Sequence, residues 1–180
     1  KSFFINFYEN FKAALNKGRE VNQLGTADFK KLDAPKQMDS LKNMVASKGA
    51  KDTWGYFKNT FTDEAGSSGN IHDLAHFIGQ LTFEKEGFDG ISICTTEFAF
   101  GCYHGFLDKA FQENLDKLNQ AEQACSFLGQ GGPFASCVHG IGHGVASFYQ
   151  ANDLKTALHS CQRLKSGQEF CYDGVFMEFE

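Results

Sequence analysis

The stretch Cys137-Val138-His139-Gly140 is one of three closely similar tetrapeptides in this chain. Cys102-Tyr103-His104-Gly105 precedes it by 35 residues, and Cys171-Tyr172-Asp173-Gly174 follows it by 34 residues. An imperfect copy, Asn70-Ile71-His72-Asp73, begins 32 residues before the first of the three. Self-similarity at a fixed period of roughly 20–50 residues is the sequence signature of repeat architectures. We therefore expect a repeat protein whose repeats begin near residue 52.

The repeated units are expected to be helical. Only two prolines interrupt the 180 residues, which favours long helices over a loop-rich scaffold. Val138, Ile141, Val145 and Phe148 form one apolar stripe at helical spacing. Each unit is interpreted as a helix A, a loop and a helix B, about 34 residues in total. The expected fold class is all-α, with helical hairpins forming a curved array.

The predicted domain organisation is one domain made of two parts. Residues 1–51 form an N-terminal helical segment, and residues 52–180 form four hairpins, of which the last looks cut short. Helices are expected over residues 1–17, 35–47, 52–61, 71–83, 103–118, 120–128, 138–150, 153–164 and from 172 onward, with a connector over 19–34 and an intra-hairpin loop over 65–69.

All six cysteines lie in the second half of the chain. The repeat places a pair around the same loop three times, and so selects the pairings Cys94–Cys102, Cys125–Cys137 and Cys161–Cys171. Zinc thiolate sites are the alternative, although no CxxC spacing occurs. Disulfide bonds predict an oxidising compartment, so the protein is expected to be secreted, periplasmic or on the cell surface. Because the chain starts at Lys1, we also expect that a signal peptide or anchor has been removed.

The segment from Ile93-Cys94 to Gly101-Cys102 resembles disulfide-bridged Sel1-like repeat proteins, in which a cysteine pair joins the two helices of a hairpin. The unit length is also similar to that of tetratricopeptide-like hairpins. The resemblance implies architecture for residues 52–180 and no function, because the Cys-x-His-Gly start of helix B is not the usual Sel1 pattern and the other two cysteine pairs are more widely spaced.

Histidines recur at equivalent positions in the repeats. His72 and His76 are separated by four residues, as are His139 and His143, so each pair projects from one helix face. His104 occupies the equivalent position in its own repeat. Imidazole and carboxylate groups that return at one position predict a transition-metal site, with Zn, Cu or Fe as the candidate metals. The predicted ligands are His72, His76, His104, His139, His143, Asp108 and Asp173.

These side chains are expected on the inner, concave face of the B helices. Adjacent packed helices lie about 8–10 Å apart, so one ion cannot join the first and last of them. A strongly curved array would gather the middle three helices around one crowded site or a dinuclear one, whereas a gentle curve would give separate sites. Gly140, Gly142 and Gly144 within one helix indicate close approach of a neighbouring helix or a ligand. Met177 and Glu178 can also reach this face near Asp173.

The sequence leaves the activity open. A metal site with an open position would support a hydrolase or an oxidase, and His72-Asp73-Leu74-Ala75-His76 is similar to the HExxH of zinc metallopeptidases, with Asp where they have Glu. The alternative is a solenoid that binds a protein or peptide on its concave face and uses the histidines as structural polar contacts. Residues 66–180 carry a net charge of −8, which argues against a nucleic-acid partner. The chain contains no apolar run of the roughly 20 residues that a transmembrane helix needs.

Overall fold

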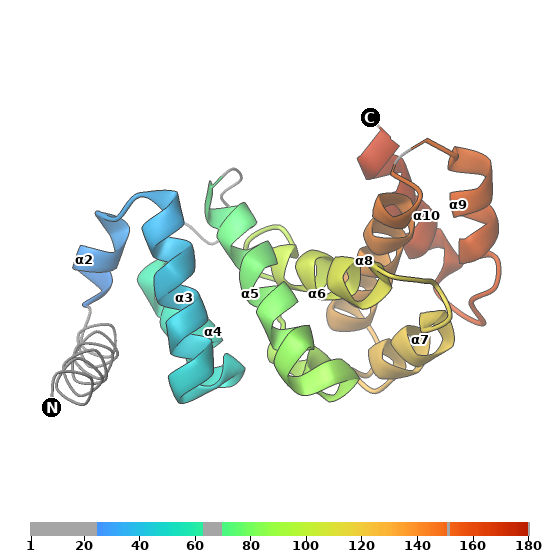
Figure 1. Cartoon of the computed structure of the whole chain (residues 1–180). Helices are drawn as coiled ribbons and strands as arrows, with labels where there is room; N and C mark the ends of the chain where they lie inside the picture. Colours follow the sequence, from blue (N-terminus) through green and yellow to red (C-terminus); the bar gives the residue numbers. More distant parts are fainter. Residues whose placement is uncertain (1–24, 63–69, 151, 180) are drawn as a thin grey trace, which may run out of the picture.

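The structure is a computed structural model that describes residues 25–62, 70–150 and 152–179. Over these residues the secondary structure is helical and contains no strand, which confirms the all-α class (Figure 1). The predicted helix over 1–17 and the predicted loop over 65–69 lie outside the described residues. None of the described helices has the length and apolar character that a membrane span would require.

Three helices open the described chain: α2 (Thr26–Lys30), α3 (Ala34–Lys48) and α4 (Ala50–Thr60). The predicted start of α3 is correct to one residue, because Asp33 caps the helix by accepting a hydrogen bond from the Lys36 N–H at 3.0 Å. Gly49, with φ of 94°, separates α3 from α4 in a backbone conformation that favours glycine. α2 lies in the segment predicted as a connector.

The next elements are α5 (Asn70–Glu86), the 3-10 helix η2 (Gly87–Ile93) and α6 (Gly101–Phe111). The prediction that α6 extends to about residue 118 is wrong. The Asn114 side chain accepts a hydrogen bond from the Asp116 N–H at 3.0 Å, and this local turn competes with continued helix. Leu115 and Leu118 are both buried in the resulting bend.

The remaining helices are α7 (Leu118–Ser126), α8 (Gly132–Phe148), α9 (Leu154–Cys161) and α10 (Gln168–Phe179). α8 begins six residues before the predicted start at Val138. Pro133 lies in its first turn, where the fixed φ of proline suits a helix and the missing N–H costs nothing. Val138, Ile141 and Val145 of the predicted apolar stripe are fully buried and Phe148 is partly buried, but they are not the only buried face, because every residue of α8 from Ser136 to Ala146 is buried.

The three predicted disulfide bonds are present: Cys94–Cys102, Cys125–Cys137 and Cys161–Cys171. They attach α6, α8 and α10, respectively, to the segment that precedes each helix. No free cysteine occurs among the described residues, so metal binding through thiolates is excluded there. Three disulfide bonds are typical of proteins from an oxidising compartment.

Four helices pack in succession, α5 against α6, α6 against α8 and α8 against α10 (Figure 1). Glycines lie at each of these contacts. A Cβ at Gly105 of α6 would overlap the backbone carbonyl of His76 in α5, and one at Gly144 of α8 would lie 2.8 Å from the Leu107 carbonyl oxygen of α6. The predicted role of the glycines in close helix approach is therefore confirmed. This close packing brings side chains of α5, α6 and α8 within reach of one another.

Candidate metal centre

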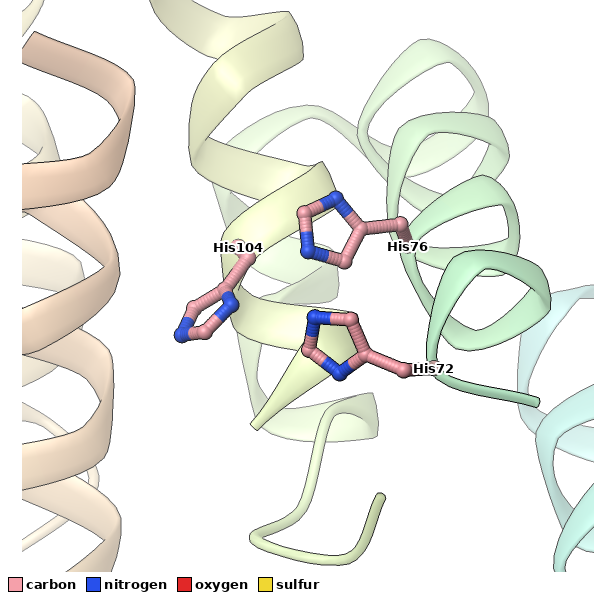
Figure 2. A group of neighbouring side chains, drawn as sticks. All are labelled: His72, His76 and His104. Atoms are coloured by element: carbon pink, nitrogen blue, oxygen red, sulfur yellow. The ribbon is translucent and has the colours of Figure 1, made fainter. Parts of the chain in front are cut away.

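Five of the six histidines meet between α5, α6 and α8. They form two groups, His72/His76/His104 and His104/His139/His143, and His104 belongs to both. Within each group, one ring nitrogen from each histidine lies within 4.8 Å of those of the other two. Figure 2 shows the first group, with the two rings of α5 facing the ring of His104 on α6. The spacing of four residues thus places the two rings of each pair on one face of their helix. The packing of α5 and α8 against α6 then brings both pairs next to the ring of His104.

The exposure of these rings differs from the expected open inner face. His104, His139 and His143 are only 2%, 7% and 5% exposed, and His72 and His76 are half-buried. The reason is that α6 and α8 are each covered by helices on two sides. The histidine cluster is therefore an interior feature rather than the lining of an open concave surface.

His104 lies at the centre of the cluster. Its ring centroid is 5.5 Å from that of His72, 5.2 Å from His76, 5.3 Å from His139 and 3.9 Å from His143. Burial, aided by the neighbouring imidazoles, lowers its pKa far below the usual range, so the ring is neutral. Both ring nitrogens are buried and find no hydrogen-bond partner among the described residues. A buried polar group without a partner is costly and uncommon in native structures.

Carboxylates fix the tautomers of His139 and His143. The Nδ1 of His139 lies 3.1 Å from Asp173 Oδ2, and the Nδ1 of His143 lies 2.5 Å from Glu178 Oε1. A carboxylate only accepts hydrogen bonds, so each Nδ1 carries the proton and donates. The Nε2 lone pairs of the two rings then face each other at 3.0 Å. Such an arrangement is unfavourable unless a cation or a shared proton lies between the two nitrogens.

His72 is also held through its Nδ1, in this case by a backbone oxygen rather than a carboxylate. His72 Nδ1 lies 2.8 Å from the carbonyl oxygen of Phe98 and donates to it, which leaves Nε2 free to bind a metal. Phe98, Ala99 and Phe100 all have positive φ, an uncommon run for residues other than glycine. The backbone of this segment is held in a strained conformation next to the cluster.

Asp108 connects the cluster to solvent. Its Oδ2 lies 3.8 Å from His76 Nδ1, and its Oδ1 is buried with no hydrogen-bond partner among the described residues. Burial, with a smaller effect from Glu178, raises the pKa of Asp108 to about 6, and burial with the nearby His72 and His143 lowers the pKa of His76 to about 4. Asp108 also lines a polar pocket of about 320 Å³ together with Gln80, Lys109, Gln112, Ser147, Phe148 and Gln150.

The remaining candidate residues lie at the edge of the cluster or at the protein surface. Asp173, predicted as a ligand, is 74% exposed and lies on the outer nitrogen of His139, away from the centre of the cluster. Glu178 has the same relation to His143, and its pKa is lowered, chiefly by that hydrogen bond. The sequence predicts Glu178 near this face but not among the ligands. Asp73 of the HExxH-like motif is exposed, and His159 lies at the surface beside Gln162.

No protein-family model, curated protein or solved structure matches this chain. The cluster is an interior set of five imidazoles with carboxylates on the outer nitrogens of two of them. Neutral imidazoles held in this way by second partners are the usual form of histidine ligands to metals.

Proposed function

We propose that the protein binds a transition metal through His72, His76, His104, His139 and His143, in an oxidising compartment such as the periplasm, the cell surface or the extracellular space. The observation that carries this proposal is His104. Its ring is buried, neutral and surrounded by four other imidazoles, while neither ring nitrogen has a hydrogen-bond partner among the described residues. A metal ion would satisfy this ring.

The donor set indicates which metals to expect. Imidazole nitrogens suit Zn, Cu and Fe, and the cysteines that would favour softer binding are used in disulfide bonds. We propose Asp108 as a further ligand on the His76 side, because its buried oxygen has no partner among the described residues. For Asp173 and Glu178 we propose a supporting role, in which each orients one histidine and makes it a stronger donor.

A purely structural histidine network is the competing interpretation. It accounts for the hydrogen bond from His72 to Phe98, and it requires a proton shared between His139 and His143. Burial and the neighbouring His143 lower the pKa of His139, which opposes an added proton. In a tetrahedral zinc site, metal–nitrogen bonds of about 2.0–2.1 Å place two nitrogens roughly 3.3 Å apart, close to the 3.0 Å between these Nε2 atoms. The same distance also suits a hydrogen bond between the two rings, so metal binding is the measurement that separates the two interpretations.

The test is metal binding by oxidised protein with a matched histidine control. We expect purified wild-type protein to retain a transition metal on elemental analysis and to bind Zn²⁺ or Cu²⁺ in calorimetric titration. The His139→Ala/His143→Ala variant should lose most of this binding, and His159→Ala, which removes a surface histidine of α9, should retain it. Folded wild-type protein with no affinity for either ion would refute the proposal.

A catalytic role is a second candidate, and the polar pocket beside Asp108 is the observation that favours it. The pocket gives a small polar molecule access to the His76 side of the cluster. A metal there would support water activation for hydrolysis, or an oxidation. Metal-loaded protein should then hydrolyse simple esters or phosphoesters, or consume oxygen with a small reductant. Absence of all these activities in fully loaded protein would contradict the catalytic candidate and leave metal binding intact.

We further propose that residues 52–180 are built as four helical hairpins. The support is that the three disulfide bonds recur along the chain, each joining the N-terminal part of α6, α8 or α10 to the preceding segment. The alternative function, peptide binding on an open concave face, gains no support from the described residues, because the three central histidines are buried.

A further inference from the structure

The position of His104 in both histidine groups raises the question of how one ring serves two sets of ligands. His72 and His76 approach it from α5, and His139 and His143 approach it from α8. Figure 2 shows one ring nitrogen of His104 directed toward His72 and His76 and the other directed away from them. Both nitrogens are buried and without a hydrogen-bond partner among the described residues. A single metal ion would satisfy only one of them.

We propose, on the basis of the metal-binding function above, that His104 bridges two metal ions as an imidazolate, one ion on each ring nitrogen. His72 and His76 complete the first site, and His139 and His143 complete the second. When the second metal–nitrogen bond forms, the remaining ring proton of His104 leaves to solvent, so the bridge carries one negative charge. With metal–nitrogen bonds of about 2.0 Å on either side of the ring, the two ions would lie roughly 6 Å apart.

The charges around the cluster fit two ions better than one. Three carboxylates lie on the histidine rings or beside them: Asp108 near His76, Asp173 on His139 and Glu178 on His143. Together with the imidazolate, they balance the four positive charges of two divalent ions. Buried charge is tolerated when it is paired in this way. One divalent ion would leave an excess of negative charge and one histidine pair without a cation.

The ligand atoms are already close to the required geometry. Within each group they lie within 4.8 Å of one another, against roughly 3.3 Å between nitrogens bound to one tetrahedral ion. In the second group the Nε2 atoms of His139 and His143 are only 3.0 Å apart, and the ring centroids of the two histidine pairs are similarly spaced, at 4.7 Å for His72 and His76 and 4.8 Å for His139 and His143. Because the helices are held together by glycine contacts, the remaining adjustment falls on the rings, and the stacked rings of His104 and His143, 3.9 Å apart and inclined by 26°, have to turn to aim one nitrogen each at the same ion.

Copper provides a direct test, because two Cu²⁺ ions joined by an imidazolate couple antiferromagnetically and lose their paramagnetic resonance signal on cooling. We expect wild-type protein to bind two Cu²⁺ per chain and to show this loss. The His72→Ala/His76→Ala variant should bind one Cu²⁺ with the full signal of one spin. Wild-type protein loaded with one Zn²⁺ and one Cu²⁺ should keep a one-spin signal, which controls for loss of signal by reduction of the copper rather than by coupling between two copper ions.

The outcomes separate the bridge from the function on which it rests. Two bound Cu²⁺ with the full signal of two spins at low temperature would overturn the bridge and leave metal binding intact. Saturation of wild-type protein at one Cu²⁺ would also overturn it. No binding of Cu²⁺ or Zn²⁺ by folded, oxidised protein would refute the proposed function itself. His159→Ala serves as the control and should match the wild type in stoichiometry and spin coupling.

Discussion

Replacing Gly105 by Ala tests whether the close contact between α5 and α6 sets the geometry of the cluster. Gly105 follows His104 directly, and an added Cβ would overlap the backbone carbonyl of His76. The opposing atoms belong to helix backbone, so they cannot move aside as a flexible side chain would. We expect the two helices to separate and the shared ring of His104 to move away from His76.

The magnitude follows from two opposing effects. Alanine in a helix interior is favoured over glycine by about 1 kcal/mol. Overpacking typically costs about 1–3 kcal/mol and sometimes more, and a clash with backbone belongs at the upper end of that range. We therefore expect Gly105→Ala to lower the free energy of unfolding by about 2 kcal/mol. For a chain of this size, that corresponds to a fall in Tm of roughly 4–8 °C.

Gly55→Ala is the matched control. Gly55 lies within α4, and a Cβ there would meet no atom within 4 Å. Only the propensity effect remains, so this variant should be more stable than wild type by about 0.5–1 kcal/mol. Urea unfolding followed by circular dichroism, with a chelator present and the disulfide bonds intact, measures both variants. If Gly105→Ala is as stable as Gly55→Ala, the proposed close contact between α5 and α6 is wrong.

Three further perturbations test other parts of the molecule. Cys125→Ala/Cys137→Ala removes a disulfide bond between residues 12 positions apart and should lower the free energy of unfolding, measured by urea titration, by about 3 kcal/mol. Unchanged stability would show that this bond does not restrict the unfolded chain. The pKa of His76 falls from its ordinary 6.5 to about 4 on folding, so the unfolded chain binds this proton first and metal-free protein loses stability as the pH falls. Between pH 6.5 and 4 the loss measured by urea unfolding should be smaller in His76→Gln than in wild type by up to about 3 kcal/mol, the share that belongs to this ring; equal losses would show that its pKa is not lowered. Glu178→Gln should weaken Zn²⁺ binding about tenfold in calorimetry, because it removes the carboxylate that accepts a hydrogen bond from His143. Glu169→Gln, at an exposed position of the same helix, should leave the affinity unaltered. Equal Zn²⁺ affinities of Glu178→Gln and wild type would show that Glu178 does not support His143.

The features of the fold that depend on spacing along the chain could be predicted from the sequence. Histidines four residues apart project from one helix face in any helix, so the pairs of α5 and α8 followed directly from their numbering. The disulfide pairing also followed, because each cysteine pair brackets one short loop. Asn114 and Pro133, which set the end of α6 and the start of α8, carry local signals that the apolar periodicity obscured.

The features of the site that depend on how the helices pack against one another could not be predicted from the sequence. The spacing on α6 does not say that His104 lies between two other helices and contacts both histidine pairs. The carbonyl oxygen of Phe98 accepts a hydrogen bond from His72, and a backbone acceptor can be supplied by any residue type. Glu178 lies five residues after Asp173, whereas the histidines of each pair are four residues apart, so it falls outside the repeated spacing. Its side chain nevertheless reaches His143. Burial of the central rings likewise follows from tertiary packing.

The closeness of the cysteines to the histidines has a consequence for how the protein matures. Cys102 and Cys137 each lie two residues before a histidine of the cluster. In a reduced chain, their thiolates would compete with imidazole for zinc or copper and would bind either ion in a different geometry. Once the cysteines are oxidised, only nitrogen and oxygen donors remain. We therefore expect oxidation to precede metal loading, so that metal supplied to the reduced chain would trap a misassembled form.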